Sequence, residues 1–112
     1  MEITSAVYKN NTIVLEVKGE VDAHTAKELN KTLTDSIAQG YYRIVIDVSR
    51  LTFISSAGLR AIMFAHREVA QLGGEVRLVG PSIQTRRTFE IAGAFELMNV
   101  SDNLQEALGG WQ

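Results

Sequence analysis

Two adjacent serines, Ser55 and Ser56, stand out among the residues that could do chemistry. They follow the apolar pair Phe53-Ile54 and precede Ala57-Gly58, after which apolar residues return at helical spacing. Hydroxyls at the start of a helix can cap its free N–H groups. A helix start also carries partial positive charge, which would accommodate a phosphoryl group. Because the neighbouring residues are small, the segment is a candidate modification site as well as a candidate cap.

A hydrolytic enzyme would need one of these serines to act with a histidine and a carboxylate. Asp22, His24 and His66 are present, but the Gly-x-Ser-x-Gly elbow of α/β-hydrolases is absent, and Asp22 and His24 both precede Ser56 by a whole strand. The sequence has no Gly-x-x-x-x-Gly-Lys-Ser/Thr phosphate loop, and Gly73-Gly74 indicates a helix end instead. We therefore expect no enzymatic activity and no cofactor.

Asp22 begins the segment Asp-Ala-His-Thr, which is a favourable helix start. Asp22 can act as an N-cap, and Thr25 with Glu28 has the spacing of a capping box one turn later. We expect His24, in the same turn, to be exposed. His66 falls on or beside the apolar stripe of a later helix, which favours a packed or interface residue. Two histidines so placed, without clustered carboxylates, predict no metal site.

Composition restricts the class of protein further. The 112-residue chain is 46% hydrophobic and 21% charged, has no cysteine and carries a net charge of −2. This predicts one soluble domain over residues 1–112 that needs no disulfide or metal. Scattered basic residues argue against nucleic acid as a partner. No apolar run reaches the roughly 20 residues that span a bilayer, and the first residues lack the order of a signal peptide. We expect a cytoplasmic monomer without membrane insertion.

The order of apolar patterns predicts an α/β fold with a mainly parallel sheet. Strand-like runs at 3–8 and 12–18 flank a hairpin turn at Lys9-Asn10-Asn11. The continuously apolar run 42–48 predicts a central strand covered on both faces. The other predicted elements are helices from Asp22 to Gly40, Leu59 to Gly73, Ser82 to about Ala92 and from Ser101, with strands at 75–79 and 95–98. Alternating strands and helices imply parallel pairing through crossovers.

Four sequence blocks in this order resemble the STAS domain of bacterial anti-sigma factor antagonists. They are GEVDAHTA (19–26), IVIDVSRLTFISSAGLRAI (44–62), GGEVRLVG (73–80) and TFEIAGAFEL (88–97). The resemblance covers nearly the whole chain and implies a single STAS domain, with a mixed, mainly parallel sheet, an N-terminal hairpin strand and about four helices. We place its core at about 3–108 and a short tail at 109–112. Whether Trp111 in this tail is loose or packed stays open.

The resemblance also implies a function in partner switching. In the family, an anti-sigma factor that is also a serine kinase phosphorylates a central serine of the antagonist. The dephosphorylated antagonist binds that kinase and frees the sigma factor, and a serine phosphatase restores this form. Alternatives within the same fold are a STAS subunit that binds the ATPase of a lipid-transport ABC assembly, and a scaffold STAS protein of a stress-sensing complex.

The family motif Asp-Ser-Ser/Thr-Gly-Leu assigns the expected site. Aligned on Gly58-Leu59, it places the phosphorylated serine on Ser56, the second hydroxyl on Ala57 and the aspartate on Ser55. The last two positions depart from the motif, and Ser55 becomes a secondary candidate acceptor. The resemblance places Asp22 near the phosphorylated serine. The expected partner surface therefore consists of Asp22, Ser55, Ser56, Ala57, Gly58 and Arg60.

Overall fold

A six-stranded mixed sheet organises the chain in the computed structural model, which describes residues 1–111. The elements are β1 (Glu2–Tyr8), β2 (Thr12–Val21), α1 (Ala26–Ala38), β3 (Arg43–Asp47), β4 (Leu51–Ile54), α2 (Ser56–Ala70), β5 (Glu75–Val79), α3 (Ile83–Ile91), α4 (Ala94–Leu97), β6 (Asn99–Ser101) and α5 (Leu104–Ala107). The strand order is β1-β2-β3-β5-β6, and β4 pairs with β2. Only β1 and β2 pair antiparallel, so the predicted mainly parallel α/β class is confirmed.

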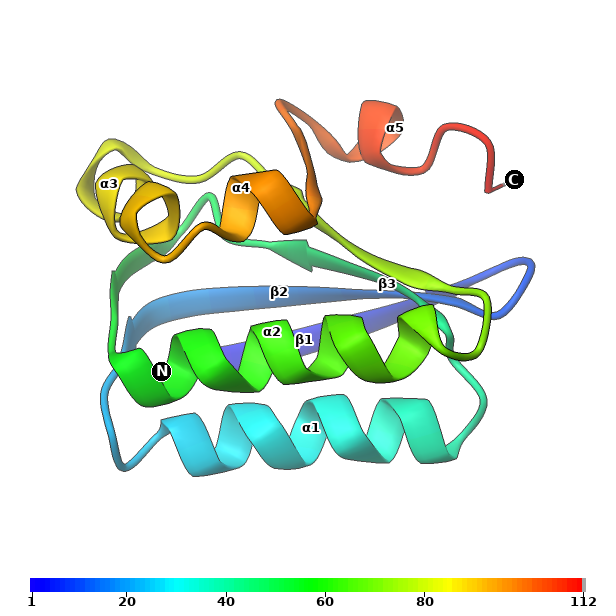
Figure 1. Cartoon of the computed structure of the whole chain (residues 1–112), viewed down its shortest axis with the longest axis horizontal. Coiled ribbons are helices and arrows are strands. Elements are labelled where there is room, and N and C mark those ends of the chain that lie inside the picture. The colour runs from blue at the N-terminus through cyan, green and yellow to red at the C-terminus, as the bar shows by residue number, and fades with distance from the viewer. Residues whose placement is uncertain (112) are drawn as a thin grey trace.

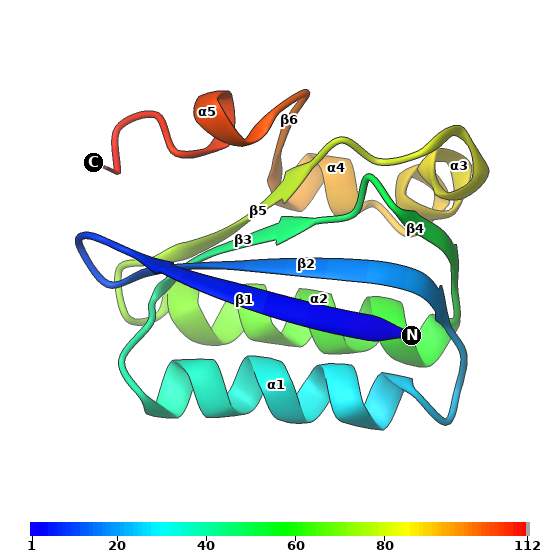
Figure 2. The same ribbon diagram turned by 180° about the vertical axis from the view of Figure 1, so that it is seen from behind.

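Helices α1 and α2 cover one face of the sheet. Figures 1 and 2 show them side by side and running in the same direction, so that both helices begin at the same end of the molecule. Leu29 and Leu33 of α1 and Ile62 and Val69 of α2 are buried against the strands. Apolar residues three, four and seven positions apart form one helical face, which is why these two segments fold as helices on the sheet.

Strand β3 lies between β2 and β5 in the middle of the sheet. Ile44, Val45 and Ile46 are fully buried. Ile44 and Ile46 join the core beneath the helices, whereas Val45 belongs to a second cluster on the opposite face. Because successive side chains of a strand point to opposite faces, a strand covered on both sides has to be apolar throughout. The predicted central strand is confirmed.

The chain after β6 covers the second face of the sheet. Trp111 is only 5% exposed and packs in a cluster with Val14, Val45, Val79, Ala107 and Leu108. The guanidinium of Arg77 stacks 3.6 Å from the centroid of the indole ring and donates hydrogen bonds to the carbonyl oxygens of Ala107 (2.7 Å) and Gly109 (2.9 Å). The packed core therefore extends to Trp111 rather than ending at about residue 108. Gln112, also within the predicted tail, lies outside the described residues.

Two predictions for the last third of the chain are wrong. The predicted strand at 95–98 is mostly helix α4, because Ala94 and Met98 are buried together at a spacing of one helical turn and Phe95 stacks on Phe89 with ring centroids 6.0 Å apart. Strand β6 comes only afterwards. Ser101 ends β6 and does not open the final helix. The cap of α5 is Asn103, whose Oδ1 accepts a hydrogen bond from the Glu106 N–H at 2.9 Å.

Strand β4 is a separate strand that the sequence did not distinguish from the central one. After β3 the chain turns at Ser49, whose N–H and hydroxyl both donate to Asp47 Oδ1 at 3.0 and 2.7 Å. Leu51 and Ile54 then anchor β4 in the core, with Thr52 and Phe53 exposed between them. Strand β4 pairs with the last residues of β2 and ends directly before the two serines.

Candidate functional site

The two serines have different roles at the start of α2. Ser55 is the N-cap residue, and its Oγ accepts a hydrogen bond from the Gly58 N–H at 3.2 Å. Ser56 is the first residue of the helix and is exposed. Within the described residues, the Ser56 hydroxyl has no hydrogen-bond partner, whereas the Ser55 hydroxyl is engaged in the cap. The arrangement therefore leaves Ser56 as the more accessible of the two hydroxyls.

The start of α2 lies beside the Asp22 turn because β2 and β4 end together. Val21 pairs with Ile54 in the parallel ladder, and the Ser55 N–H donates to the Val21 carbonyl at 2.8 Å. The residue after Val21 is Asp22. The carboxyl ends of parallel strands meet at one edge of a sheet, which is where α/β folds usually place their sites. The structure thus brings Asp22, Ser55 and Ser56 to one end of the molecule.

Asp22 organises its own turn through a reciprocal pair of hydrogen bonds. Its Oδ1 accepts from the Thr25 N–H (2.8 Å), the Thr25 hydroxyl (3.0 Å) and the His24 N–H (3.0 Å), while Thr25 Oγ1 accepts from the Asp22 N–H at 2.9 Å. These bonds, that from the Thr25 N–H above all, lower the pKa of the Asp22 carboxyl, which favours its charged form. Asp22 therefore caps the turn that leads into α1, whereas the N-cap residue of the helix itself is Thr25 and not Asp22 as predicted. His24 is exposed as expected.

The predicted capping box between Thr25 and Glu28 is wrong. Thr25 precedes α1, but its side chain makes no capping hydrogen bond to that helix. The reciprocal exchange typical of a capping box forms between Asp22 and Thr25 instead, one turn earlier. The turn is therefore held by its own side chains, and it keeps the Asp22 carboxylate at the edge shared with Ser55.

Gly58 lets the first turn of α2 pack tightly against the ends of two strands. A Cβ atom at this position would come within 2.8 Å of Cγ1 of Ile54 and 2.8 Å of Cγ1 of Val21. Real Cβ atoms do not approach other carbons so closely, so any larger residue would push the helix away from the sheet. Glycine at position 58 therefore lets the first turn of α2, which contains Ser56, lie directly against the ends of β2 and β4.

The remaining site residues divide into core and surface. Ala57 is half-buried and Arg60 is exposed, whereas Leu59 and Ile62 belong to the core. Phe64 on α2, which is not part of the predicted partner surface, is 47% exposed. Its signal in the sequence is an aromatic residue placed outside the apolar stripe of its helix.

Comparison with known proteins identifies the family. The model of the STAS domain matches residues 4–107. The chain belongs to the STAS domain family.

Relatives of this STAS domain carry the names of regulatory proteins. A protein of Bordetella bronchiseptica named "Putative anti-sigma factor antagonist BtrV" is 30% identical over 96 residues, which are 86% of this chain and 83% of that protein. The solved structure of the anti-sigma factor antagonist SpoIIAA in its unphosphorylated form matches with a TM-score of 0.84 at 25% identity, covering 96% of this chain and 93% of that one. The phosphorylated form of the Bacillus protein SpoIIAA shares the fold, with a TM-score of 0.79 at 24% identity and coverage of 99% and 100%.

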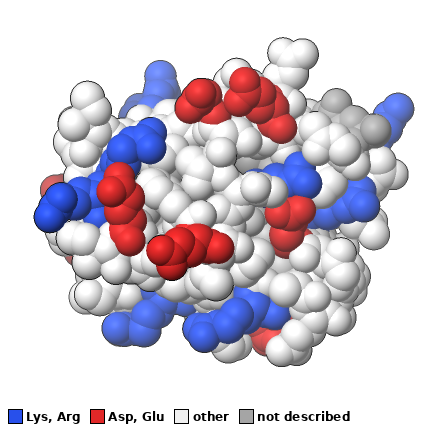
Figure 3. Space-filling model, turned by 45° about the horizontal axis from the view of Figure 1, so that its top comes forward, with Lys and Arg blue, Asp and Glu red and all other residues white. Residues whose placement is uncertain are grey.

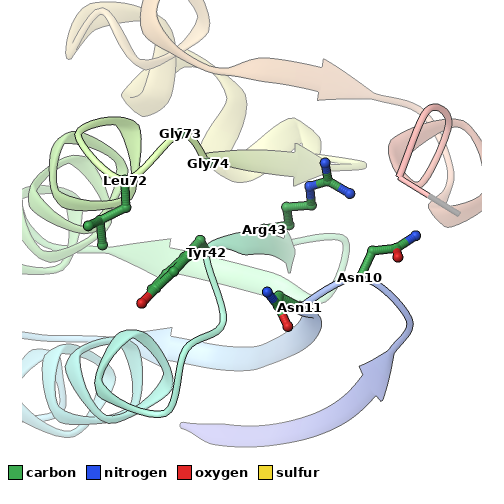
Figure 4. A pocket seen from close by; sticks show the side chains of 7 residues that line it. All are labelled: Asn10, Asn11, Tyr42, Arg43, Leu72, Gly73 and Gly74. Carbon is green, nitrogen blue, oxygen red and sulfur yellow. The ribbon is translucent and has the colours of Figure 1, made fainter.

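A hollow lies at the end of this STAS domain opposite to Ser56. Its volume is about 320 Å³, and it is lined by Asn10, Asn11, Tyr42, Arg43, Leu72, Gly73 and Gly74. Figure 4 shows Tyr42 pointing to one side and Arg43 and Asn10 to the other, and the Arg43 guanidinium lies 5.8 Å from the centroid of the Trp111 ring. The Asn10 amide also donates to the Trp111 carbonyl at 2.9 Å. Because these polar groups do not converge on one point, we assign the hollow no ligand.

We looked at this STAS domain for a basic surface, a metal site and a membrane-spanning helix. In the view of Figure 3, acidic and basic side chains are interspersed over the visible face and do not gather into a basic area. Among residues 1–111, no cluster of three or more histidine, aspartate or glutamate side chains could hold a metal ion. Within the same range, no helix combines the length and apolar character needed to cross a membrane.

His66 makes the stability of this STAS domain dependent on pH. Its Nδ1 accepts a hydrogen bond from the Val76 N–H at 3.1 Å, and burial lowers its pKa, against an opposing influence of Glu75. In the unfolded chain the histidine binds a proton near its ordinary pKa of about 6.5, whereas in the folded chain it does so only at lower pH. The unfolded state therefore binds more protons in this window, and stability has to fall as the pH falls below about 6.5.

We expect the thermal midpoint to drop between pH 7 and pH 5, and the drop to be smaller in His66→Asn. Asparagine offers an acceptor to Val76 without titrating in this range. Differential scanning calorimetry at a series of pH values measures the effect, with the exposed His24→Asn as the matched control. A pH dependence unchanged in His66→Asn, or flattened equally by His24→Asn, would contradict the assignment.

Proposed function

We propose that this STAS domain is an anti-sigma factor antagonist that acts by partner switching. Its unphosphorylated form binds an anti-sigma factor that is a serine kinase, and the sigma factor is released. The kinase transfers a phosphoryl group from ATP to Ser56, after which the complex dissociates. A serine phosphatase then removes the phosphate and restores the binding form. The domain itself catalyses no reaction and needs no cofactor.

The observation that carries this proposal is the exposed Ser56 hydroxyl at the first position of α2, beside the Asp22 turn. The names of the relatives supply the regulatory context. Ser55 occupies the motif position at which antagonists have an aspartate, but its hydroxyl accepts from the Gly58 N–H. The Ser55 hydroxyl is half-buried and engaged in this cap, whereas the Ser56 hydroxyl is exposed, so Ser56 is the better acceptor. Its oxygen attacks the terminal phosphorus of ATP held by the kinase, ADP leaves, and the kinase accepts the proton.

Phosphate on Ser56 can disrupt an interface without refolding either protein. It adds about −1.5 to −2 charges and three strong acceptor oxygens. An interface that fits a neutral serine would then contain uncompensated charge that has lost its water. The Asp22 carboxylate, whose pKa is lowered by its hydrogen bonds to Thr25 and His24, adds negative charge at the same end of the molecule. Burying two negative charges at one interface costs more than burying one, which favours separation of the complex in the phosphorylated state.

Sigma-factor release tests the proposed function. The candidate anti-sigma factor kinase is mixed with its sigma factor, the purified STAS domain is added, and the free sigma factor is measured by size-exclusion chromatography. We expect the unphosphorylated domain to displace the sigma factor and Ser56→Asp to leave the complex intact. If the wild-type domain releases no sigma factor but binds the ATPase of a lipid transporter, the proposal is overturned in favour of a transport subunit.

A further inference from the structure

A groove between α1 and α2 adjoins the Asp22 turn and the start of α2. Its volume is about 500 Å³, and it is lined by Ala23, Ala26, Lys27, Asn30, Ala57, Arg60, Ala61 and Phe64. Apart from Ala23 in the Asp22 turn, the lining residues belong to α1 and α2, which run parallel with their N-terminal ends together (Figures 1 and 2). The groove is therefore continuous with the surface that contains Ser56.

The groove has an apolar floor and one aromatic wall. Ala26 and Ala61 are 4% and 6% exposed and form part of the floor, while Phe64 remains 47% exposed beside them. Small side chains allow a helix or strand of another protein to approach closely. Burying a half-exposed aromatic ring at an interface contributes favourable binding free energy. This combination fits an inserted apolar side chain better than a polar ligand.

The charges at the groove are positive. Lys27 on α1 and Arg60 on α2 are both exposed, and neither forms a salt bridge within the described residues. Among the described residues that line the groove, none carries a carboxylate. The N-terminal ends of both helices add partial positive charge. Asp22 in the adjoining turn is negative, but its Oδ1 is held by Thr25 and His24. A basic groove on a chain of net charge −2 selects an acidic partner.

We infer that this groove binds an acidic amphipathic helix of the anti-sigma factor. An apolar side chain of that helix packs against Phe64 and the alanines, and carboxylates on either side of it pair with Lys27 and Arg60. The identity of the partner rests on the proposed function, whereas the chemistry of the contact follows from the groove. The interface then extends along α1 to Lys27 and Asn30, well beyond the surface expected from the sequence.

Amide NMR and affinity measurements with the candidate anti-sigma factor kinase test this inference. We expect the amide signals of Ala26, Ala61 and Phe64 to shift together with that of Ser56 when the kinase binds. Phe64→Ala and Lys27→Glu should each weaken binding about tenfold or more, because one removes the aromatic wall and the other reverses a charge. Arg87→Glu makes the same charge change on the exposed surface of α3 and should bind like wild type.

The outcomes separate the groove from the switch. Signal shifts confined to Asp22 and Ser56, with wild-type affinity in Phe64→Ala and Lys27→Glu, would overturn the groove and leave the proposed function standing. Groove binding that Ser56→Asp does not weaken would support the groove and overturn the switch. Absence of binding would overturn both, and a dimer of the free chain broken by Phe64→Ala would assign the groove to a second copy. The amide spectrum of each variant establishes that it folds, and Arg60→Glu repeats the charge test on α2.

Discussion

Ser56→Asp is expected to weaken binding to the anti-sigma factor kinase at least a hundredfold, a loss of about 2.7 kcal/mol. The aspartate places a negative charge at the exposed first position of α2, beside the charged Asp22 carboxyl. Ser56→Ala, which cannot be phosphorylated, should instead bind constitutively, even after incubation with ATP. Isothermal titration calorimetry with and without ATP measures both variants.

The matched control for this charge is Ser5→Asp, because Ser5 is an exposed serine on β1, away from α2. It introduces the same side chain and the same net charge without touching the proposed interface. Its affinity should equal that of the wild-type domain. Equal affinity of wild type, Ser56→Asp and Ser56→Ala would refute the switch. A loss of affinity in Ser5→Asp as large as that in Ser56→Asp would show that net charge, and not the position of the charge, weakens binding.

Trp111→Ala is expected to lower the free energy of unfolding by about 3 kcal/mol. The indole is 5% exposed, packs on Val14, Val45 and Val79, and lies under the guanidinium of Arg77. Its removal leaves a cavity on the second face of the sheet and deprives Arg77 of its stacking partner. Urea denaturation measures the loss of stability. Unfolding is followed by circular dichroism, because the variant lacks the only tryptophan of the chain and therefore has no tryptophan fluorescence.

Trp111→Phe is the matched control, because it keeps an aromatic ring over the sheet and should lose about half as much stability. If Trp111→Ala costs less than about 1 kcal/mol, which is the effect typical of an ordinary substitution, then the segment after α5 does not belong to the core in solution. In that case the second face of the sheet must be stabilised by α5 alone.

The location of the candidate site could be predicted because it follows from chain order and residue type. A buried strand, two hydroxyls and two small residues indicate a strand end passing into a helix, and Asp22 marks another such junction. Parallel pairing brings the two junctions together. Which serine caps the helix could not be predicted, since both have a suitable side chain. The choice depends on the Ser55 backbone being extended and bonded to Val21.

The end of the chain was harder to predict because its elements are short. A run such as Phe95-Glu96-Leu97-Met98 fits a strand or a helical turn equally well by apolar pattern alone. Contacts with distant residues decide it, in this case Phe89 for Phe95. Trp111 is a similar case: its burial depends on Arg77 and on valines from three strands, which no local pattern contains. The groove was missed for the same reason, since it needs α1 and α2 side by side.

Mass spectrometry of the intact domain and its peptides, after incubation with ATP and the candidate anti-sigma factor kinase, tests partner switching at Ser56 directly. We expect one phosphate on the wild-type domain, located on Ser56 by peptide sequencing, and none on Ser56→Ala. Phosphate that persists on Ser56→Ala, on Ser55 or elsewhere, or a wild-type domain that binds the kinase yet is never phosphorylated, would contradict partner switching at Ser56.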